Sequence, residues 1–441
     1  MFKARSLFGG AAAMLLAISA FGSTAHAADK VTITISTWTG VDEAAQLQQI
    51  IDKINASQSD YQIVHQPIPN DYTTAVKTQL AGGTAADLYW LGNEDMALDS
   101  QGVFAPLTSC LKGAPAKSAG DVSDYYPGVL DIAKYNGEVY GLPWIAQPVV
   151  VFYNKDMFKA AGLAEPTPDW TWDDFMKDAK TLTLKDSSGK VSQWGFTANG
   201  WPPPQMFVWQ AGGDVISADY KTSPIDSPAA IEGWKFYLSL AYNPALAPSS
   251  DTIKEQGFDS MFTAGKVAMF MGGATDDKDL KPGLNVGVVS VPRNPTTKSN
   301  TTFAWVGATF MSAATAHPAE ACKALLALTE GIQNWKIVSP RISQGTIEHL
   351  IASVPGKQAN AAAIMAAVPQ MRAFHIVPQM SQWNDIFWNK FMGPLLNGET
   401  KESVDQLAKE IRPQLEAVLP TGGTMSMSAT MSATMAATTS K

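Results

Sequence analysis

The order of the fold is set by residues 31–55, VTITISTWTGVDEAAQLQQIIDKIN. From Val31 to Ser36 apolar and polar residues alternate, which predicts a β-strand with one buried face. After Trp38-Thr39-Gly40 the apolar spacing becomes that of a helix, carried by Ala44, Leu47, Ile50, Ile51 and Ile54. Strand, loop and helix therefore follow one another within this single stretch.

The same order of strand and helix then recurs. We predict strands at Tyr61–His65 and Asp87–Leu91, and helices at Tyr72–Leu80 and Glu94–Gly102. Alternating strands and helices are typical of an α/β fold in which helices cover both faces of a mostly parallel sheet. Ligands of such sheets bind where strands end and loops begin. The residues expected on that rim are Trp38, Asp42, Asn93 and Glu94.

The middle of the chain predicts a crossing between two lobes. Asn136-Gly137 suits a tight hairpin turn, and the short strand after it is expected to end at Leu142-Pro143. The unbroken apolar run Val149–Tyr153 suits a fully buried strand, and we place the crossing there. Thr171 is expected to cap a helix over Trp172–Leu184.

The remaining sequence is mostly helical. Further strands are expected at Val267–Met271 and Val286–Val291. The helices expected are a short one through Phe207 and Trp209 that stops at Gly212-Gly213, then Ala229–Tyr242, Asp259–Ala264, Ala319–Leu328, Ala359–Val368, Trp383–Leu396 and Lys401–Leu419.

The two ends of the chain are expected to lie outside the fold. Residues 1–27 have basic residues, an apolar stretch and Ala25-His26-Ala27, the layout of a cleavable signal peptide. We therefore expect an exported protein. Residues 421–441 repeat Met, Ser, Ala and Thr with almost no charge, which predicts a disordered tail. Copper binding by the thioethers of its methionines is a weaker alternative.

Composition excludes several classes of protein. The chain has 441 residues and a net charge of -8; cleavage after residue 27 removes two of the 32 basic residues, so the charge becomes -10. A length of this size suggests two or three domains. An acidic chain is a poor binder of nucleic acid. The 13 Trp suggest surfaces built for stacking.

The two cysteines, Cys110 and Cys322, leave two interpretations open. Export would place them in an oxidising compartment, where they could form one disulfide. We favour two separate buried thiols, because the sequence does not show how far apart the residues lie.

The sequence contains no recognisable catalytic motif. There is no Gly-x-Ser-x-Gly, no P-loop, and no second His one turn from His349. We expect no cofactor, no metal site and no enzymatic activity. The acidic pairs Glu94-Asp95 and Asp173-Asp174 could serve a glycosidase, but first-turn helix charges are the favoured interpretation.

Tryptophan is concentrated at predicted loop ends instead. Aromatic rings stack on the flat C–H faces of sugars, while Asp, Asn, Glu and Gln hydrogen-bond to hydroxyls. The tryptophans at these positions are Trp38, Trp90, Trp144, Trp201, Trp209, Trp305 and Trp383. About half of them should belong to the core, since large aromatics dominate cores generally.

Several segments resemble the bacterial extracellular solute-binding proteins of carbohydrate ABC importers, the group that includes maltose-binding protein. They are Gly141-Leu142-Pro143, Phe152–Phe158, Ala161-Gly162-Leu163, Thr171–Phe175, Gly265–Met269, Pro378–Ser381 and the late helix Val404–Leu419. The resemblance runs from about Val31 to Leu419. It implies a type II periplasmic-binding fold, with two α/β lobes joined by hinge strands. The implied division is residues 28–146 plus 303–368 for lobe 1 and 147–302 plus 369–420 for lobe 2.

The resemblance also implies a set of ligand contacts. Asn93 and Gln147 stand where maltose binders carry acids, the loop around Gly273 lacks a Trp, and Asn384 rather than Trp383 occupies the matching Trp position. These departures argue against maltose as the ligand. The expected contacts are Trp38, Asp42, Tyr72, Trp90, Asn93, Glu94, Gln147, Trp201, Trp209, Gly273, Trp305, Trp383 and Asn384.

We therefore expect a monomeric periplasmic protein that captures a small sugar, polyol or glycoside and delivers it to membrane ABC permease subunits. One alternative is a binder of a phosphorylated polyol such as glycerol phosphate, with Arg341 as the cation. A less favoured alternative is an exported carbohydrate-active hydrolase.

Overall fold

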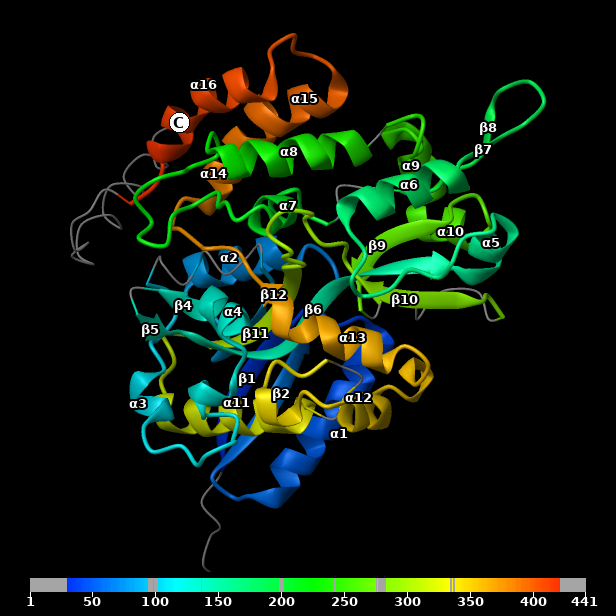
Figure 1. Cartoon of the computed structure of the whole chain (residues 1–441). Coiled ribbons are helices and arrows are strands. Elements are labelled where there is room, and N and C mark those ends of the chain that lie inside the picture. The colour runs from blue at the N-terminus through cyan, green and yellow to red at the C-terminus, as the bar shows by residue number, and fades with distance from the viewer. Residues whose placement is uncertain are drawn as a thin grey trace, which may run out of the picture.

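Strand β6 (Gly141–Asn154) runs through both halves of the molecule. From Gly141 to Pro148 it pairs with β11 (Thr302–Met311), and from Val149 onward it pairs with β9 (Met269–Gly273) and β10 (Val286–Ser290). Its partners therefore change between Pro148 and Val149. In the computed structural model the two lobes lie on either side of this change, one carrying α1 and α11 and the other α8 and α16 (Figure 1).

The structure describes residues 30–93, 98, 102–135, 137–197, 202–241, 243–274, 276, 283–333, 335 and 338–420. The remaining strands in these ranges are β1 (Val31–Thr37), β2 (Tyr61–Pro67), β3 (Leu88–Leu91), β4 (Lys134–Tyr135), β5 (Glu138–Val139), β7 (Leu184–Lys185), β8 (Val191–Gln193) and β12 (Met371–Arg372).

The helices of the described ranges include several that the sequence analysis did not predict, such as those over residues 155–160 and 347–353. The helices are α1 (Val41–Ser57), α2 (Tyr72–Gly82), α3 (Thr108–Leu111), α4 (Pro127–Leu130), α5 (Lys155–Ala160), α6 (Trp172–Leu182), α7 (Gln205–Gln210), α8 (Pro228–Leu240), α9 (Ser250–Gln256), α10 (Phe258–Thr263), α11 (Pro318–Ile332), α12 (Ile347–Ser353), α13 (Ala361–Ala367), α14 (Met380–Ile386), α15 (Gly393–Asn397) and α16 (Val404–Glu416).

Some predictions concern residues outside the described ranges. These are the signal peptide, the Met-rich tail, Asn136 of the predicted turn, Glu94 with most of its predicted helix, and Trp201. Within the described residues, no helix has an apolar run as long as a membrane crossing requires.

The main sheet is mixed rather than mostly parallel. Strand β1 is parallel to β2 and β3, as the alternation of strands and helices predicts. Strand β11 is antiparallel to β3 and β6, and β6 is antiparallel to β9 and β10. The antiparallel pairs occur at the crossing, where β6 and β11 traverse the molecule in opposite directions.

The prediction of two separate strands around Pro143 and Val149 is wrong, because β6 is continuous. Proline lacks the N–H that a ladder needs, and such residues are tolerated at irregularities. The register shifts between Gly307 and Ala308, so that Trp144 has no partner and Pro143 lies beside the irregularity. Pro148 lies at the last pairing position with β11, where the neighbouring strand changes.

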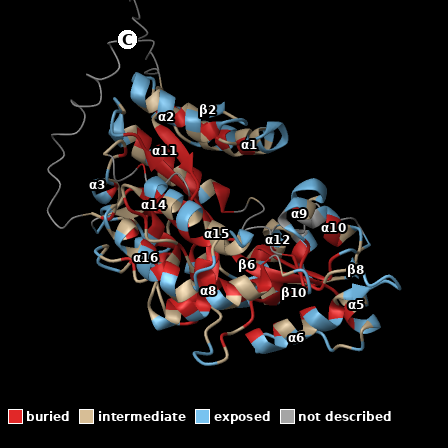
Figure 2. Cartoon of the chain, turned by 90° about the horizontal axis from the view of Figure 1, so that it is seen from above, coloured by how far each residue is buried: buried red, intermediate tan, exposed pale blue. Residues whose placement is uncertain are grey.

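The central strand β11 was missed by the sequence analysis. Its residues TFAWVGATFM are buried except for the half-buried Trp305. Helices α1 and α11 cover one face of its sheet, burying residues such as Leu47 and Leu325. Seen from above, the strands are buried and the outer helix faces are exposed (Figure 2).

Helix α13 packs against β10 and β6. The division that assigns residues 303–368 to the first lobe stays a prediction. Earlier in the chain, before α12, the carbonyl of Val338 accepts a hydrogen bond of 3.2 Å from the N–H of Ala146. The chain has therefore returned to the crossing strand ahead of α12, which brings α13 against the second half-sheet.

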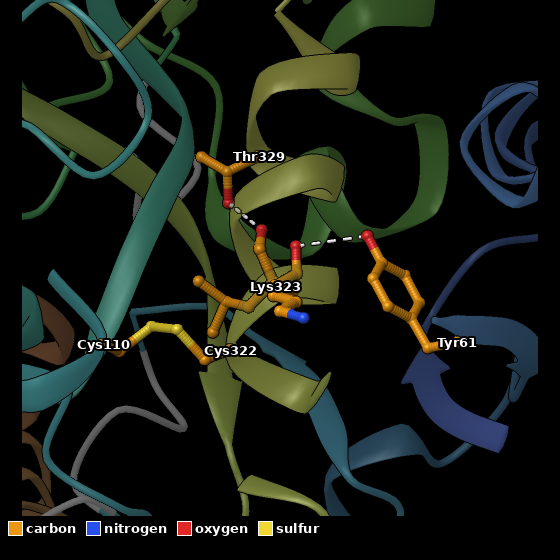
Figure 3. The surroundings of a disulfide bond; sticks show 6 residues. Tyr61, Cys110, Cys322, Lys323 and Thr329 are labelled. Atoms are coloured by element: carbon orange, nitrogen blue, oxygen red, sulfur yellow. Dashed lines mark hydrogen bonds between the residues drawn. A yellow bond between two sulfur atoms is a disulfide. The ribbon is translucent and has the colours of Figure 1, made fainter. Parts of the chain in front are cut away.

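Cys110 and Cys322 form a disulfide, so the favoured prediction of separate thiols is wrong. The bond joins α3 to α11, and the Cα atoms are 5.7 Å apart. Next to Cys322, the carbonyl of Lys323 accepts a hydrogen bond of 3.4 Å from the hydroxyl of Tyr61 in β2 (Figure 3). Helix α11 is thus fastened on one side by a covalent bond and on the other by the sheet edge.

We expect the double substitution Cys110→Ser with Cys322→Ser to lower the free energy of unfolding by about 2 to 5 kcal/mol, because the bond closes a large loop in the unfolded chain. Urea unfolding measures the difference. Reductant should lower the stability of the wild type to that of the variant and leave the variant unchanged. Equal midpoints for the oxidised wild type and the variant would contradict this expectation.

Candidate ligand-binding site

Three aromatic side chains meet where the first strands end. Trp38 directly follows β1 and is half-buried. The ring of Tyr72 lies edge-on to it at 5.8 Å, and the ring of Trp305 lies nearly perpendicular to it at 6.0 Å. Neither indole N–H of Trp38 or Trp305 donates to another described residue. Trp38 and Trp305 therefore form a half-exposed aromatic corner.

Two further tryptophans pack against Trp38 in this corner. The rings of Trp90 and Trp144 are 4.1 Å apart, and they lie 5.4 and 5.9 Å from Trp38. Trp90 is 0% exposed and Trp144 is 3% exposed. Trp90 therefore presents no free face to a ligand in this conformation, and it packs against Trp38 and Trp144.

Asn93 holds the strand that carries Trp305. Its side-chain Nδ2 donates to the carbonyl of Ala304 at 3.1 Å, and its Oδ1 accepts from the N–H of Val306 at 2.6 Å. Both ends of the amide are thus bonded to the residues that flank Trp305. Asn93 is buried, and in this conformation it positions the aromatic corner.

Gln147 and Gly273 continue the site across the change of lobes. Gln147 lies opposite Trp305 in the register of β6 and β11, so the two side chains share one face of the sheet. A Cβ on Gly273 would lie 3.0 Å from Gln147 Oε1 and 3.2 Å from Asp276 Oδ1. The missing side chain of Gly273 therefore leaves room for both polar groups.

A second aromatic group lies on the other side of Trp305. Phe303 precedes Trp305 by two residues on β11, so its side chain lies on the same face, roughly 7 Å along the strand. The ring of Trp209 from α7 stacks on Phe303 at 6.4 Å, and the guanidinium of Arg372 in β12 lies 4.7 Å from the Trp209 ring. Trp209 is thus enclosed between Phe303 and Arg372.

Arg372 brings a positive charge to this site. Its Nη2 donates to Asp214 Oδ2 at 2.5 Å and lies 3.3 Å from His375 Nε2. Its Nε and Nη1 have no partner among the described residues, and the side chain is 30% exposed. Burial alone would raise the pKa of Asp214, but the His375 ring and the charge of Arg372 outweigh it, so this pKa lies below its usual value. Asp214 therefore stays ionised and balances the charge of Arg372.

The sequence analysis missed Asp214, Arg372 and His375. Arg372 and His375 belong to Met371-Arg372-Ala373-Phe374-His375, a stretch shortly before the resemblance segment Pro378–Ser381. Its position there was the only available signal, because β12 has two residues and shows no periodicity.

Three other predicted contacts lie apart from this face. Asp42 is exposed in the first turn of α1. Trp383 is 0% exposed and stacks on Phe387 at 5.1 Å, with no ring contact to the described aromatics of the site. Asn384 follows it in α14 and is half-buried. Glu94 and Trp201 lie outside the described residues.

The structure also resolves two of the open alternatives. Arg341 is 0% exposed, donates to both oxygens of Glu330 at 2.9 and 3.1 Å, and also donates to the carbonyl of Lys117 at 3.3 Å. Its prediction as a phosphate-binding cation is wrong, because its charge is already compensated inside the protein. Asp174 belongs to the capping box of α6 with Thr171, which confirms the predicted cap and the first-turn interpretation of this acidic residue.

The fold defines the class of the protein. Two α/β lobes joined by continuous strands are the architecture of type II solute-binding proteins. A substrate-binding protein from Listeria monocytogenes, solved in complex with cycloalternan, superposes with a TM-score of 0.72 at 24% identity, over 88% of this chain and 99% of that one. The model of the bacterial extracellular solute-binding protein family matches residues 38–330, and the chain belongs to this family.

Two curated relatives come from Brucella abortus. A putative binding protein is 24% identical over 78% of this chain and 82% of its own length. An sn-glycerol-3-phosphate-binding periplasmic protein is 27% identical over 65% of this chain and 66% of its own length.

We expect Asn93→Ala to lower the free energy of unfolding by about 1 to 3 kcal/mol, because a backbone carbonyl and an N–H would lose their partners. The loss is measured by urea unfolding. The variant should also bind ligand more weakly, because Trp305 is no longer held.

Asn55→Ala is the matched control. Asn55 bridges the N–H and the carbonyl of Ile63 in the same way, at 2.8 and 3.0 Å, but on β2. It should lose a similar amount of stability and keep the affinity of the wild type. Equal affinity losses in both variants would contradict the positioning role of Asn93.

Proposed function

We propose that this protein is the exported solute-binding component of an ABC importer, and that it captures a small uncharged carbohydrate between its lobes. The observation that carries the proposal is the half-exposed corner of Trp38 and Trp305 beside Arg372, in a chain that belongs to the extracellular solute-binding family. It would act as a monomer and deliver the ligand to permease subunits. Residues 1–27 would be its signal peptide, with the periplasm as destination.

The chemistry of the site suits a sugar. The two indole rings offer apolar faces to the C–H groups of a sugar ring. The free Nε and Nη1 of Arg372 donate to hydroxyl oxygens, and the Asp214 carboxylate accepts from hydroxyl groups. Contacts with both groups at once would favour the closed state, since a ligand shifts a conformational equilibrium only by its differential affinity.

Charge balance favours an uncharged ligand over a phosphorylated polyol. The similarity to an sn-glycerol-3-phosphate-binding protein is the observation that keeps this second candidate. A phosphate would meet Arg372 already paired, at 2.5 Å, with an ionised carboxylate. The lowered pKa of Asp214 also argues against a hydrolase, because a general acid in glycoside hydrolysis needs a raised pKa.

A thermal-shift screen tests the ligand class. We expect a mono- or disaccharide, glycoside or polyol to stabilise the protein by about 2.7 kcal/mol at 100 times its dissociation constant. Glycerol 3-phosphate and inorganic phosphate are the anionic comparisons. Stabilisation by glycerol 3-phosphate alone would replace the proposal with the second candidate, and no stabilisation by any compound would overturn both.

Trp305→Ala should weaken binding of the compound found in this screen by about tenfold or more, because it removes one wall of the aromatic corner. Isothermal titration measures the change. Trp388→Ala is the control, since Trp388 is half-buried and packs on Phe387 at 5.4 Å in the C-terminal helices. An unchanged affinity in Trp305→Ala would remove this ring from the site.

A further inference from the structure

We propose that His375 positions Arg372 and thereby makes ligand capture depend on pH. The proposal rests on the proposed function in one respect, which is that Arg372 contacts the ligand. His375 itself is a positioning residue, because it acts through the guanidinium.

A single ring nitrogen of His375 lies within reach of two oppositely charged partners. His375 Nε2 is 3.3 Å from Arg372 Nη2 and 3.6 Å from Asp214 Oδ2. We assign the neutral ring its proton on Nδ1, so that Nε2 accepts a hydrogen bond from the guanidinium. With a proton it donates to the carboxylate instead. A change in protonation therefore exchanges one partner for the other.

Protonation of His375 also weakens the ion pair between Arg372 and Asp214. The guanidinium and the charged ring would share the same oxygen, Asp214 Oδ2, and would repel each other. The second oxygen of Asp214 is already engaged, since it accepts from Trp209 Nε1 at 3.3 Å and from the N–H of Val215 at 2.8 Å. Arg372 would therefore lose its fixed position over Trp209. Its Nε and Nη1 groups would then no longer be held in one orientation for the ligand.

The surroundings leave His375 able to respond to solvent. The charged groups that face it are Asp214 and Arg372, and the ring of Tyr220 lies edge-on at 5.6 Å. The His375 side chain is 24% exposed, so protons reach it. The pKa of Asp214 is lowered, so this carboxylate keeps its charge across the pH range in which histidine as a residue type gains a proton.

Binding is measured at pH 8, 6.5 and 5 with cycloalternan, mannobiose and maltotriose as probes. We expect the affinity of the wild type for a bound probe to fall by about tenfold between pH 8 and pH 5. His375→Gln keeps an acceptor that does not titrate, so it should bind at pH 5 as the wild type does at pH 8. His375→Ala lacks the acceptor and should bind weakly at every pH.

Two control variants separate His375 from other histidines. His317→Gln changes an exposed residue at the start of α11 and should keep the pH profile of the wild type. His65→Gln changes the histidine that lies 2.6 Å from Thr37 Oγ1 near Trp38; burial lowers its pKa, so it should also keep most of the profile. A flat profile in the wild type, or an unchanged pH dependence in His375→Gln, would overturn the inference.

A measurement without ligand makes the two proposals separable. Side-chain ¹⁵N signals of Arg372, assigned with Arg372→Lys, should shift between pH 8 and pH 5 in the wild type and stay constant in His375→Gln. If no probe binds at any pH but the signals shift as expected, the positioning role stands and the ligand class fails. Constant signals in the wild type would overturn the positioning role whatever the ligand.

Discussion

The backbone ladder of β6 is the constraint on which the rest of the structure depends. The same fourteen-residue strand is bonded to β11 in one lobe and to β9 and β10 in the other, so no flexible linker separates the lobes there. The ladder brings Trp305 opposite Gln147 and places Gly273 next along the crossing. The side chains proposed to bind the ligand therefore lie along one sheet that passes through both lobes.

Different interactions stabilise the two halves of this face. On one half the contacts are between packed indole rings, because the buried Trp90 and Trp144 pack against the half-exposed Trp38 and hold it in place. On the other half, charge dominates, because Arg372 is held over Trp209 by Asp214. Packing holds a ring in place at every pH, whereas the position of a paired charged group depends on the charges of its neighbours. The first half is thus suited to holding a sugar ring and the second to discriminating among polar groups.

Local patterns carried much of the fold but little of the site. The alternation of strands and helices predicts β1, α1, β2 and α2, and Thr171 predicts the start of α6, because these features depend on near neighbours. Strand β11 was missed because a mostly apolar segment does not distinguish a buried strand from a buried helix. The sequence does not show whether a tryptophan side chain is covered by the core or left open to a ligand. Trp90 and Trp38 could therefore not be distinguished from the sequence. The pair of Asp214 and Arg372 is separated by 158 residues, and nothing local connects them.

The disulfide has a consequence for how the chain is assembled and taken apart. Cys110 and Cys322 are separated by 212 residues, and the strands β6, β9, β10 and β11 all lie between them. The covalent ring therefore encloses the two passages between the lobes that β6 and β11 make. The bond cannot form before Cys322 has been synthesised, so the ring closes late. Once it is closed, a protease cut anywhere within the ring leaves the pieces joined as one particle.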